Sequence, residues 1–201
     1  MHNDLTNPQP SVPFLCGERV YLRPFEKEDL AHIHIWANDP ELRRLTGEVT
    51  PMSQSGAEKY YERVQNDENR VWLMIVVKEN ERVIGETGLL RIFNPWRTAD
   101  LSIIIGDKYA WGKGYGKEAA LLLLDYAFGA LALHRIAIGV VGFNEHALRF
   151  YEKIGFKREG IQRDGYFYNH QFSDFVMMSI LEDEYRALHR EGKGLPAGTR
   201  A

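Results

Sequence analysis

The sequence has one cysteine among its 201 residues, Cys16, which excludes an intrachain disulfide. No apolar stretch approaches the roughly 20 residues of a membrane-spanning helix, and the run Ala119–Leu124, for example, ends at a charged residue. Lysine and arginine form no block and the net charge is -3, so neither nucleic acid nor a membrane is expected as a partner. Residues 1–13 lack the basic and apolar segments of a secretory signal. We therefore expect a cytoplasmic protein.

The composition is that of a globular domain, with 44% apolar and 26% charged residues. A chain of this length buries enough apolar surface for one domain of ordinary size. We expect that domain to span 17–188. The proline-containing segment 1–16 and the glycine- and proline-rich segment 189–201 are expected to be flexible tails.

Hydrophobic periodicity predicts an α+β domain rather than a doubly wound sheet. Most of the expected strands are antiparallel, with one parallel crossover through a long, nearly all-apolar helix. No repeat or second domain is visible. The strands are expected at 20–22, 71–77, 83–93, 101–105, 134–141, 156–168 and 172–181, and the helices at 26–37, 39–47, 53–67, 114–131 and 145–154.

Three glycines alternate immediately before the long helix, at Gly112, Gly114 and Gly116. Glycine admits backbone conformations that point successive N–H groups into one concavity, and a helix N-terminus adds positive potential, so such a turn can bind phosphate. A turn that merely starts the helix is an equally open interpretation from these residues alone. The dinucleotide-binding G-x-G-x-x-G within a βαβ unit and the P-loop G-x-x-x-x-G-K-[ST] are both absent.

Two segments together resemble the GNAT acetyltransferase superfamily. The segment Trp111–Lys117 carries Gly114 and Gly116 of the family pattern Q/R-x-x-G-x-G/A, with Trp111 where glutamine or arginine is usual. The segment Asn144–Phe156 matches the pattern N-x-x-A-x-x-x-Y-x-x-x-G-F. The resemblance runs from about residue 18 to 181 and points to the ribosomal-protein alanine and spermidine acetyltransferase subgroups.

The resemblance implies a fold. It is a mixed, mostly antiparallel sheet of six to seven strands, flanked by helices on both faces, with a splay between the fourth and fifth strands. It also implies acetyl-CoA as the cosubstrate, a primary amine as the acceptor, no metal, and a possible homodimer. The acceptor would be a small polyamine-like amine or a protein N-terminus.

The cofactor is expected in that splay. The backbone of the strand 103–105 would pair with the pantetheine arm of acetyl-CoA, while the glycine turn would hold the pyrophosphate. The expected cofactor-binding residues are Ile103, Ile104, Ile105, Trp111, Gly112, Lys113, Gly114, Tyr115, Gly116, Lys117, Asn144, Ala147 and Tyr151.

Acetyl transfer needs a base for the amine and an acid for the leaving thiolate. Tyr151 is the candidate acid by resemblance, although its helix also has an apolar face on which a tyrosine would simply pack. Asp100, where the family often has glutamate, and Glu86 on the preceding strand are rival bases. Each carboxylate is equally interpretable as a solvated charge near a strand end. Glu48, after the second helix, is expected to line the amine entrance.

The remaining alternatives concern the function as a whole. An acyl-CoA-binding module without turnover would keep the glycine turn but show no product, and a purely structural protein would use it only as a turn. The histidines at His32 and His34 point in different directions from one helix and do not form a metal pair. The segment 166–170 near the last hairpin is expected to shape the acceptor pocket, to form a contact between subunits, or simply to pack within its strands.

Overall fold

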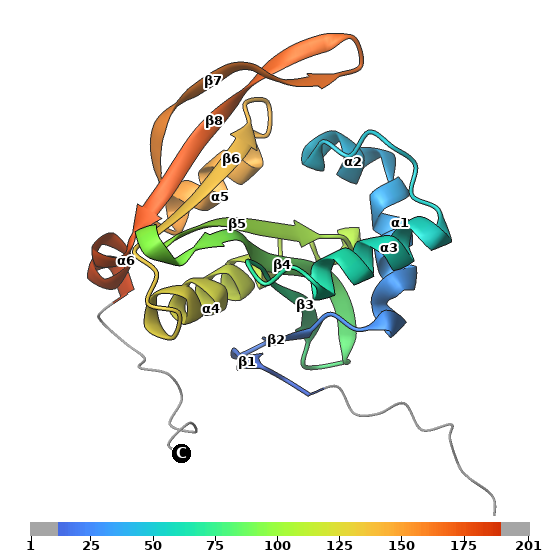
Figure 1. Ribbon diagram of the computed structural model, residues 1–201, viewed down its shortest axis with the longest axis horizontal. Coiled ribbons are helices and arrows are strands. Elements are labelled where there is room, and N and C mark those ends of the chain that lie inside the picture. Colours follow the sequence, from blue (N-terminus) through green and yellow to red (C-terminus); the bar gives the residue numbers. More distant parts are fainter. Residues whose placement is uncertain (1–11, 190–201) are drawn as a thin grey trace, which may run out of the picture.

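The computed structural model describes residues 12–189 and contains one eight-stranded sheet with the strand order β1-β2-β3-β4-β5-β6-β8-β7 (Figure 1). Neighbouring strands are antiparallel except β5 and β6, which are parallel. This confirms the predicted α+β class. The strands are β1 (Leu15–Cys16), β2 (Val20–Pro24), β3 (Val71–Val77), β4 (Arg82–Phe93), β5 (Thr98–Ile105), β6 (Arg135–Val141), β7 (Lys157–Tyr168) and β8 (Gln171–Leu181).

Helices cover both faces of the sheet. Successive side chains of a strand point to opposite faces, and both faces of this sheet carry apolar side chains that the helices bury. In β3, Met74 belongs to the apolar cluster of the first three helices, whereas Ile75 belongs to the larger cluster that contains the long helix. The helices are α1 (Leu30–Asn38), α2 (Pro40–Thr46) and α3 (Gln54–Gln65) on the first face, α4 (Tyr115–Gly129) and α5 (Glu145–Lys153) on the second, and α6 (Glu182–His189) directly after β8.

Local sequence signals explain where the short helix α2 begins and ends. Asp39 accepts hydrogen bonds from the backbone N–H groups of Glu41 (3.0 Å) and Leu42 (3.1 Å), and Pro40 occupies the first turn, where its missing N–H costs nothing. Gly47 ends the helix in the left-handed region, with φ 79°. The helix lies within the range 39–47 that the sequence predicts.

Several element boundaries differ from the sequence-based expectation. The predicted helix 26–37 is divided into a 3-10 turn, η1 (Lys27–Asp29), and α1. Strand β5 begins at Thr98 rather than 101, because its first residues pair with both β4 and β6. Helix α4 ends at Gly129 rather than 131, and α6 was not predicted. The other two 3-10 turns are η2 (Asn94–Trp96) and η3 (Lys108–Ala110).

The predicted N-terminal tail is partly wrong. Leu15 and Cys16 form β1 and pair with Leu22 and Tyr21, which brings the strand number to eight rather than six or seven. The pairing is extended by Phe14, whose N–H donates to the carbonyl oxygen of Leu22 (2.7 Å). The rest of the predicted tails falls mainly on 1–11 and 190–201, outside the described residues. Within 12–189, no helix is long and apolar enough to cross a membrane.

Candidate functional site

Strands β5 and β6 pair only where they begin. Residues 98–100 lie opposite residues 135–137, after which β6 continues along β8 as far as Val141, and no described strand pairs with the same edge of β5 beyond Asp100. Figure 1 shows the two strands diverging from this point. The opening lies between the fourth and fifth strands counted from β2, as predicted, and it leaves one edge of residues 101–105 unpaired.

The register of β4 and β5 decides which backbone groups face this opening. Ile104 is the direct partner of Glu86, and its carbonyl oxygen points at β4, where it leaves no room for a side chain at Gly85. Because backbone groups of successive residues point to opposite edges of a strand, those of Ile103 and Ile105 point into the opening. Of the three isoleucines expected to pair with pantetheine, only these two therefore offer backbone groups, while Ile104 offers its side chain beside Glu86.

The glycine turn lies at the end of β5, after η3, and joins it to α4. Gly112 (φ 72°) and Gly114 (φ 82°) both adopt the left-handed backbone region, and Gly114 is the N-cap residue of α4. Nothing lies within 4 Å of the position that a Cβ would take at Gly112, so this glycine serves conformation rather than packing. Gly116 belongs to the first turn of α4. The turn is exposed, as are Lys113 and Lys117, so its N–H groups are accessible to an anion.

Trp111 connects the turn to the strand before it. Its indole Nε1 donates a hydrogen bond to the carbonyl oxygen of Ile105 (2.7 Å), which is one of the groups facing the opening. The side chain remains 36% exposed. Trp111 therefore holds the last carbonyl of β5, and its polar atom is not directed at the turn in the way a flexible glutamine or arginine could be.

The N-terminus of α5 places two further predicted residues. Asn144 caps the helix, because its Oδ1 accepts a hydrogen bond from the backbone N–H of Ala147 (3.1 Å). Both residues belong to the segment that follows β6, which ends at Val141. The predicted cofactor contact of Asn144 and Ala147 remains a proposal.

Tyr151 lies on the buried face of α5, with only 5% of its surface exposed. Its ring packs edge-on against Phe150 (4.9 Å between centroids) and Phe156 (5.4 Å), within the same apolar cluster that Ile103 and Ile105 border. Burial raises the pKa of its phenol above the usual range, so the group stays protonated. Among residues 12–189 nothing hydrogen-bonds to its hydroxyl, which leaves that proton available to a ligand.

Glu86 is a buried carboxylate on β4, 7% exposed, on the face covered by α1–α3. Its Oε2 accepts hydrogen bonds from the indole of Trp72 (2.7 Å) and the hydroxyl of Tyr60 (3.4 Å). Burial raises its pKa to about 7, against the opposing effect of these two hydrogen bonds and of the charge of Arg70. A carboxylate with a pKa near neutrality is suited to accept a proton from an amine.

Asp100, the rival base, is engaged by a cation. It forms an ion pair with Arg91 on β4 and lies opposite Ala137, where β5 and β6 are still paired. It is therefore at the closed end of the opening, whereas Glu86 lies beside its open part at Ile104. Glu86 on β4 lies opposite Ile104 on β5, and Ile104 is four residues from Asp100. Because side chains an even number of residues apart along a strand share a face, the two carboxylates lie on the same face of the sheet.

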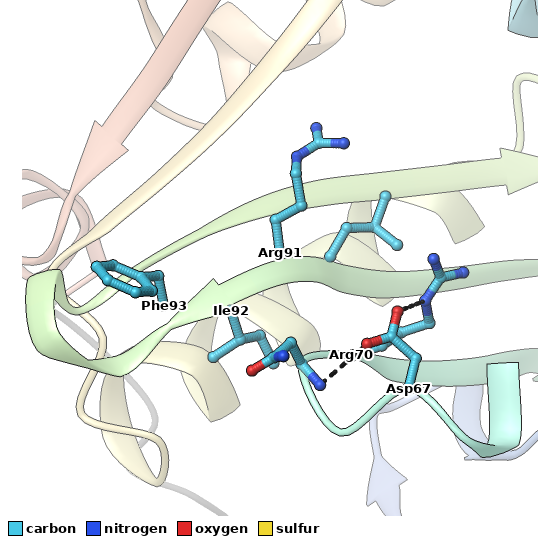
Figure 2. Close-up of a pocket in the computed structure, with 7 residues that line it drawn as sticks. Asp67, Arg70, Arg91, Ile92 and Phe93 are labelled. Atoms are coloured by element: carbon cyan, nitrogen blue, oxygen red, sulfur yellow. Dashed lines mark hydrogen bonds and ion pairs between the residues drawn. The ribbon is translucent and has the colours of Figure 1, made fainter. Parts of the chain in front are cut away.

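Arg91 also borders a shallow hollow of about 450 Å³ over the outer half of β4 (Figure 2). Figure 2 shows Arg91 pointing away from the ion pair of Asp67 and Arg70 at the other side of this hollow. Phe93 lies at its far end. The hollow is separate from the glycine turn, which lies beyond the opposite end of β5.

The last hairpin, formed by β7 and β8, contacts helix α2 through Tyr166. Its hydroxyl donates to the carbonyl oxygen of Arg44 in α2 (2.8 Å), and its ring packs against Phe143 after β6 (5.7 Å) and Phe175 on β8 (5.9 Å). Tyr166 therefore joins α2 to both strands beyond the opening. Glu48, just after α2, is half-buried, and its place at the amine entrance remains a proposal.

Sequence reasoning missed the partners of these groups. From the sequence, Tyr60 is only one residue of the expected helix 53–67 and Trp72 one residue of the expected strand 71–77, because their link to Glu86 arises from strand register and helix packing. Arg91 and Arg19 carried no motif. Among the described residues, no cluster of three His, Cys, Asp or Glu side chains is arranged to hold a metal ion.

The substitution Gly114→Val is expected to weaken CoA binding about a hundredfold, because a β-branched residue at φ 82° is strained and its Cβ would lie 3.1 Å from Arg19 Nη2. Gly116→Ala is the matched control, since its Cβ would lie at an ordinary 3.4 Å from Ile105. Trp111→Gln keeps a donor and is expected to retain binding. Isothermal calorimetry gives the three affinities, and equal values would remove the turn from the cofactor site.

Known proteins resemble this chain over most of its length. The model of the acetyltransferase (GNAT) domain matches residues 19–157. The spermidine N(1)-acetyltransferase of Escherichia coli strain K12 is 32% identical over 171 residues, covering 85% of this chain and 90% of that protein. The spermidine N(1)-acetyltransferase of Vibrio cholerae is 31% identical over 169 residues, covering 84% of this chain and 96% of that protein.

A solved structure shares the fold. The crystal structure of spermidine N-acetyltransferase from Vibrio cholerae in complex with CoA and spermine superposes with a TM-score of 0.78 at 29% sequence identity, and covers 83% of this chain and 98% of that one. The residues matched by the domain model, 19–157, contain the opening between β5 and β6, the glycine turn and α5.

Proposed function

This chain belongs to the GNAT acetyltransferase family and is an acetyl-CoA-dependent N-acetyltransferase, and we propose that its acceptor is a primary amine of a small polyamine. The observation that carries the proposal is the similarity to two bacterial spermidine N(1)-acetyltransferases over 84–85% of the chain. The buried carboxylate of Glu86, beside the opening, supports it because an alkylammonium must give up a proton before it can attack.

In this proposal the opening holds the thioester. The backbone groups of Ile103 and Ile105 pair with the pantetheine arm as an added strand would, and the N–H groups of residues 112–116 receive the pyrophosphate. Holding the thioester at a fixed place next to the amine converts an encounter between two molecules into a reaction within one complex. The acceptor then approaches from the face covered by α1–α3, where Glu86 lies.

Glu86 acts as the base and Tyr151 as the acid. Glu86 takes one proton from the ammonium of the acceptor, and the free amine attacks the thioester carbonyl to form the new C–N bond. The C–S bond then breaks, and the phenol of Tyr151 gives its proton to the departing thiolate. The attacking nitrogen loses its second proton to solvent, which leaves a neutral amide, and solvent returns a proton to the phenol. The raised pKa of the Tyr151 phenol keeps that proton in place until the thiolate forms.

The charges on the acceptor side suit a cation. Asp39 and Glu41 share the ammonium of Lys108 (2.8 and 3.0 Å), and Asp100 is paired with Arg91. Within residues 12–189, by contrast, Glu86 and Glu48 form no ion pair. These two carboxylates are the anions proposed to receive the ammonium groups of the acceptor.

A steady-state panel tests the acceptor. The kcat/KM for spermidine is expected to exceed that for a peptide with an N-terminal alanine by about a hundredfold, because a site that loses matched charges at the second amine binds less tightly. n-Butylamine, which carries one amine on a comparable chain, is the matched control for the second charge. Faster turnover of the peptide would disprove the polyamine proposal and leave the acetyltransferase activity intact.

We infer further that the protein acts in the cytoplasm, where acetyl-CoA and polyamines occur together, and that two copies form a homodimer. The edge strand β7 supports the dimer, because it exposes Ile161 (64%) and no other strand within residues 12–189 pairs with its outer edge. Sedimentation of the purified chain distinguishes a dimer from a monomer.

A further inference from the structure

Arg19 lies beside the glycine turn although it comes from the other end of the chain. It follows β1, and its Nη1 donates a hydrogen bond to the carbonyl oxygen of Lys113 (3.0 Å). Its guanidinium carbon is 5.0 Å from the ring centroid of Tyr115. Its Nη2 lies 3.1 Å from the position that a Cβ would take at Gly114. The guanidinium therefore runs along the turn from Lys113 to Tyr115.

A carboxylate in the first turns of α4 holds Arg19 in this place. Glu118 Oε1 accepts hydrogen bonds from the backbone N–H groups of Arg19 (2.7 Å) and Val20 (3.2 Å), while its Oε2 is 3.3 Å from Arg19 Nε. A Cβ at Gly17 would lie 2.3 Å from Glu118 Oε1, so a side chain there would displace the carboxylate from this position. The anchoring orders both the backbone and the side chain of Arg19.

One nitrogen of this ordered guanidinium has no partner. Nε and Nη1 are engaged, but within residues 12–189 neither a hydrogen bond nor an ion pair involves Nη2, and half of the Arg19 side chain is exposed. Nη2 is also the nitrogen nearest to Gly114. At the motif position where the family usually has glutamine or arginine, this chain has Trp111. The indole N–H of Trp111 donates to the carbonyl oxygen of Ile105 instead of pointing at the turn. The turn therefore takes its fixed cation from Arg19.

We infer that Arg19 binds the pyrophosphate of acetyl-CoA, with Nη2 donating to a phosphate oxygen that sits on the N–H groups of the glycine turn. Guanidinium is well suited to this contact, because it is always charged and its N–H groups lie in one plane. The inference rests on the use of acetyl-CoA by this family and not on the identity of the acceptor.

Calorimetric titration of the full chain, without any acceptor, tests this role. Arg19→Met keeps the side-chain length and removes the charge, and is expected to weaken CoA binding about tenfold, as the loss of one exposed charge-assisted hydrogen bond would. Dephospho-CoA lacks the 3′-phosphate but keeps the pyrophosphate. Arg19→Met is expected to weaken the binding of dephospho-CoA by the same factor as the binding of CoA. Arg19→Lys is expected to fall between wild type and Arg19→Met.

Arg186→Met is the matched control, because Arg186 likewise forms an ion pair with a glutamate of its own neighbourhood, Glu182 (2.9 Å), but lies on α6. It is expected to leave CoA affinity unchanged. Pantetheine, which carries no phosphate, separates binding from folding effects, and its affinity measured by NMR titration is expected to be equal in wild type and Arg19→Met.

Three outcomes would overturn the inference. Unchanged CoA affinity in Arg19→Met would exclude a contact, and a loss confined to CoA but absent with dephospho-CoA would move the contact to the 3′-phosphate. An equal loss for pantetheine would reduce Arg19 to a support of the turn. If Arg19→Met does not fold, the affinities of Arg19→Lys for CoA, dephospho-CoA and pantetheine are compared with those of the wild type instead. Failure of wild type to bind CoA would instead contradict the cosubstrate.

Discussion

Glu86→Gln is expected to lower kcat about 10²- to 10³-fold, the usual contribution of a general base. The substitution is nearly isosteric, and the amide oxygen can still accept the hydrogen bond from Trp72 that holds the side chain in place. What is lost is the ability to take a proton from the acceptor amine. Single-turnover rates with saturating acetyl-CoA and spermidine measure this loss apart from product release.

The pH dependence of the same variant gives a second readout. Because burial raises the pKa of Glu86 to about 7, the fraction of ionised base rises through neutral pH, and kcat of the wild type is expected to rise with it. Glu86→Gln is expected to lack this rise. The same shift makes the folded state bind the proton more tightly than the unfolded chain, so wild-type stability falls as the pH rises from about 4.5 to 7. Glu86→Gln removes that fall.

Asp100→Asn is the matched control for Glu86→Gln. Asp100 is the other carboxylate on this face of the sheet, but its charge is paired with Arg91 at the closed end of the opening. We expect its kcat to change by less than about fivefold, with the pH profile retained. The reverse result, a large loss in Asp100→Asn and a small one in Glu86→Gln, would identify Asp100 as the base.

Tyr151→Phe is expected to lower kcat about 10²-fold while leaving the free energy of unfolding nearly unchanged. The two effects separate because nothing among the described residues hydrogen-bonds to the hydroxyl, whereas the ring packs against Phe150 and Phe156. Removing the hydroxyl therefore leaves no buried polar group unpaired. Rapid-quench kinetics and thermal unfolding of the same preparation measure both quantities.

Tyr185→Phe provides the opposite signature. Tyr185 is also buried, but its hydroxyl donates a hydrogen bond to the carbonyl oxygen of Leu121 (3.3 Å) in the middle of α4. We expect this variant to lose about 1 kcal/mol of stability and to keep its kcat. A Tyr151→Phe variant that loses stability but not activity would assign Tyr151 to the core alone.

Local signals in the sequence predicted most of the framework. Some residues determine only the structure of their near neighbours, so their effect can be predicted from the sequence. Examples are the N-cap residues of α2 and α5 and the glycines before α4. Helix α6 was missed because it continues from β8 without a proline or glycine to mark the change. Strand β1 was missed because two residues are too few to show a period.

The polar contacts of the site could not be predicted in the same way. Whether Glu86 faces Ile104 and α3, or the opposite side, depends on the register of β4, and a slip of one residue would reverse its face. The contact of Arg19 with Glu118 joins residues 99 positions apart. Such contacts follow from the assembled sheet, so the sequence left Asp100 and Glu86 as equal candidates, whereas the structure shows their different surroundings.

The most direct measurement is one turnover of acetyl-CoA that carries an isotopic label in its acetyl group. The wild-type protein, in excess over the labelled cosubstrate, is mixed with spermidine, and the products are identified by mass spectrometry. The label is predicted to appear on a primary amine of spermidine, at a rate that falls about 10²-fold in both Glu86→Gln and Tyr151→Phe. A bound label that stays on CoA, or transfer at the wild-type rate by both variants, would contradict the account.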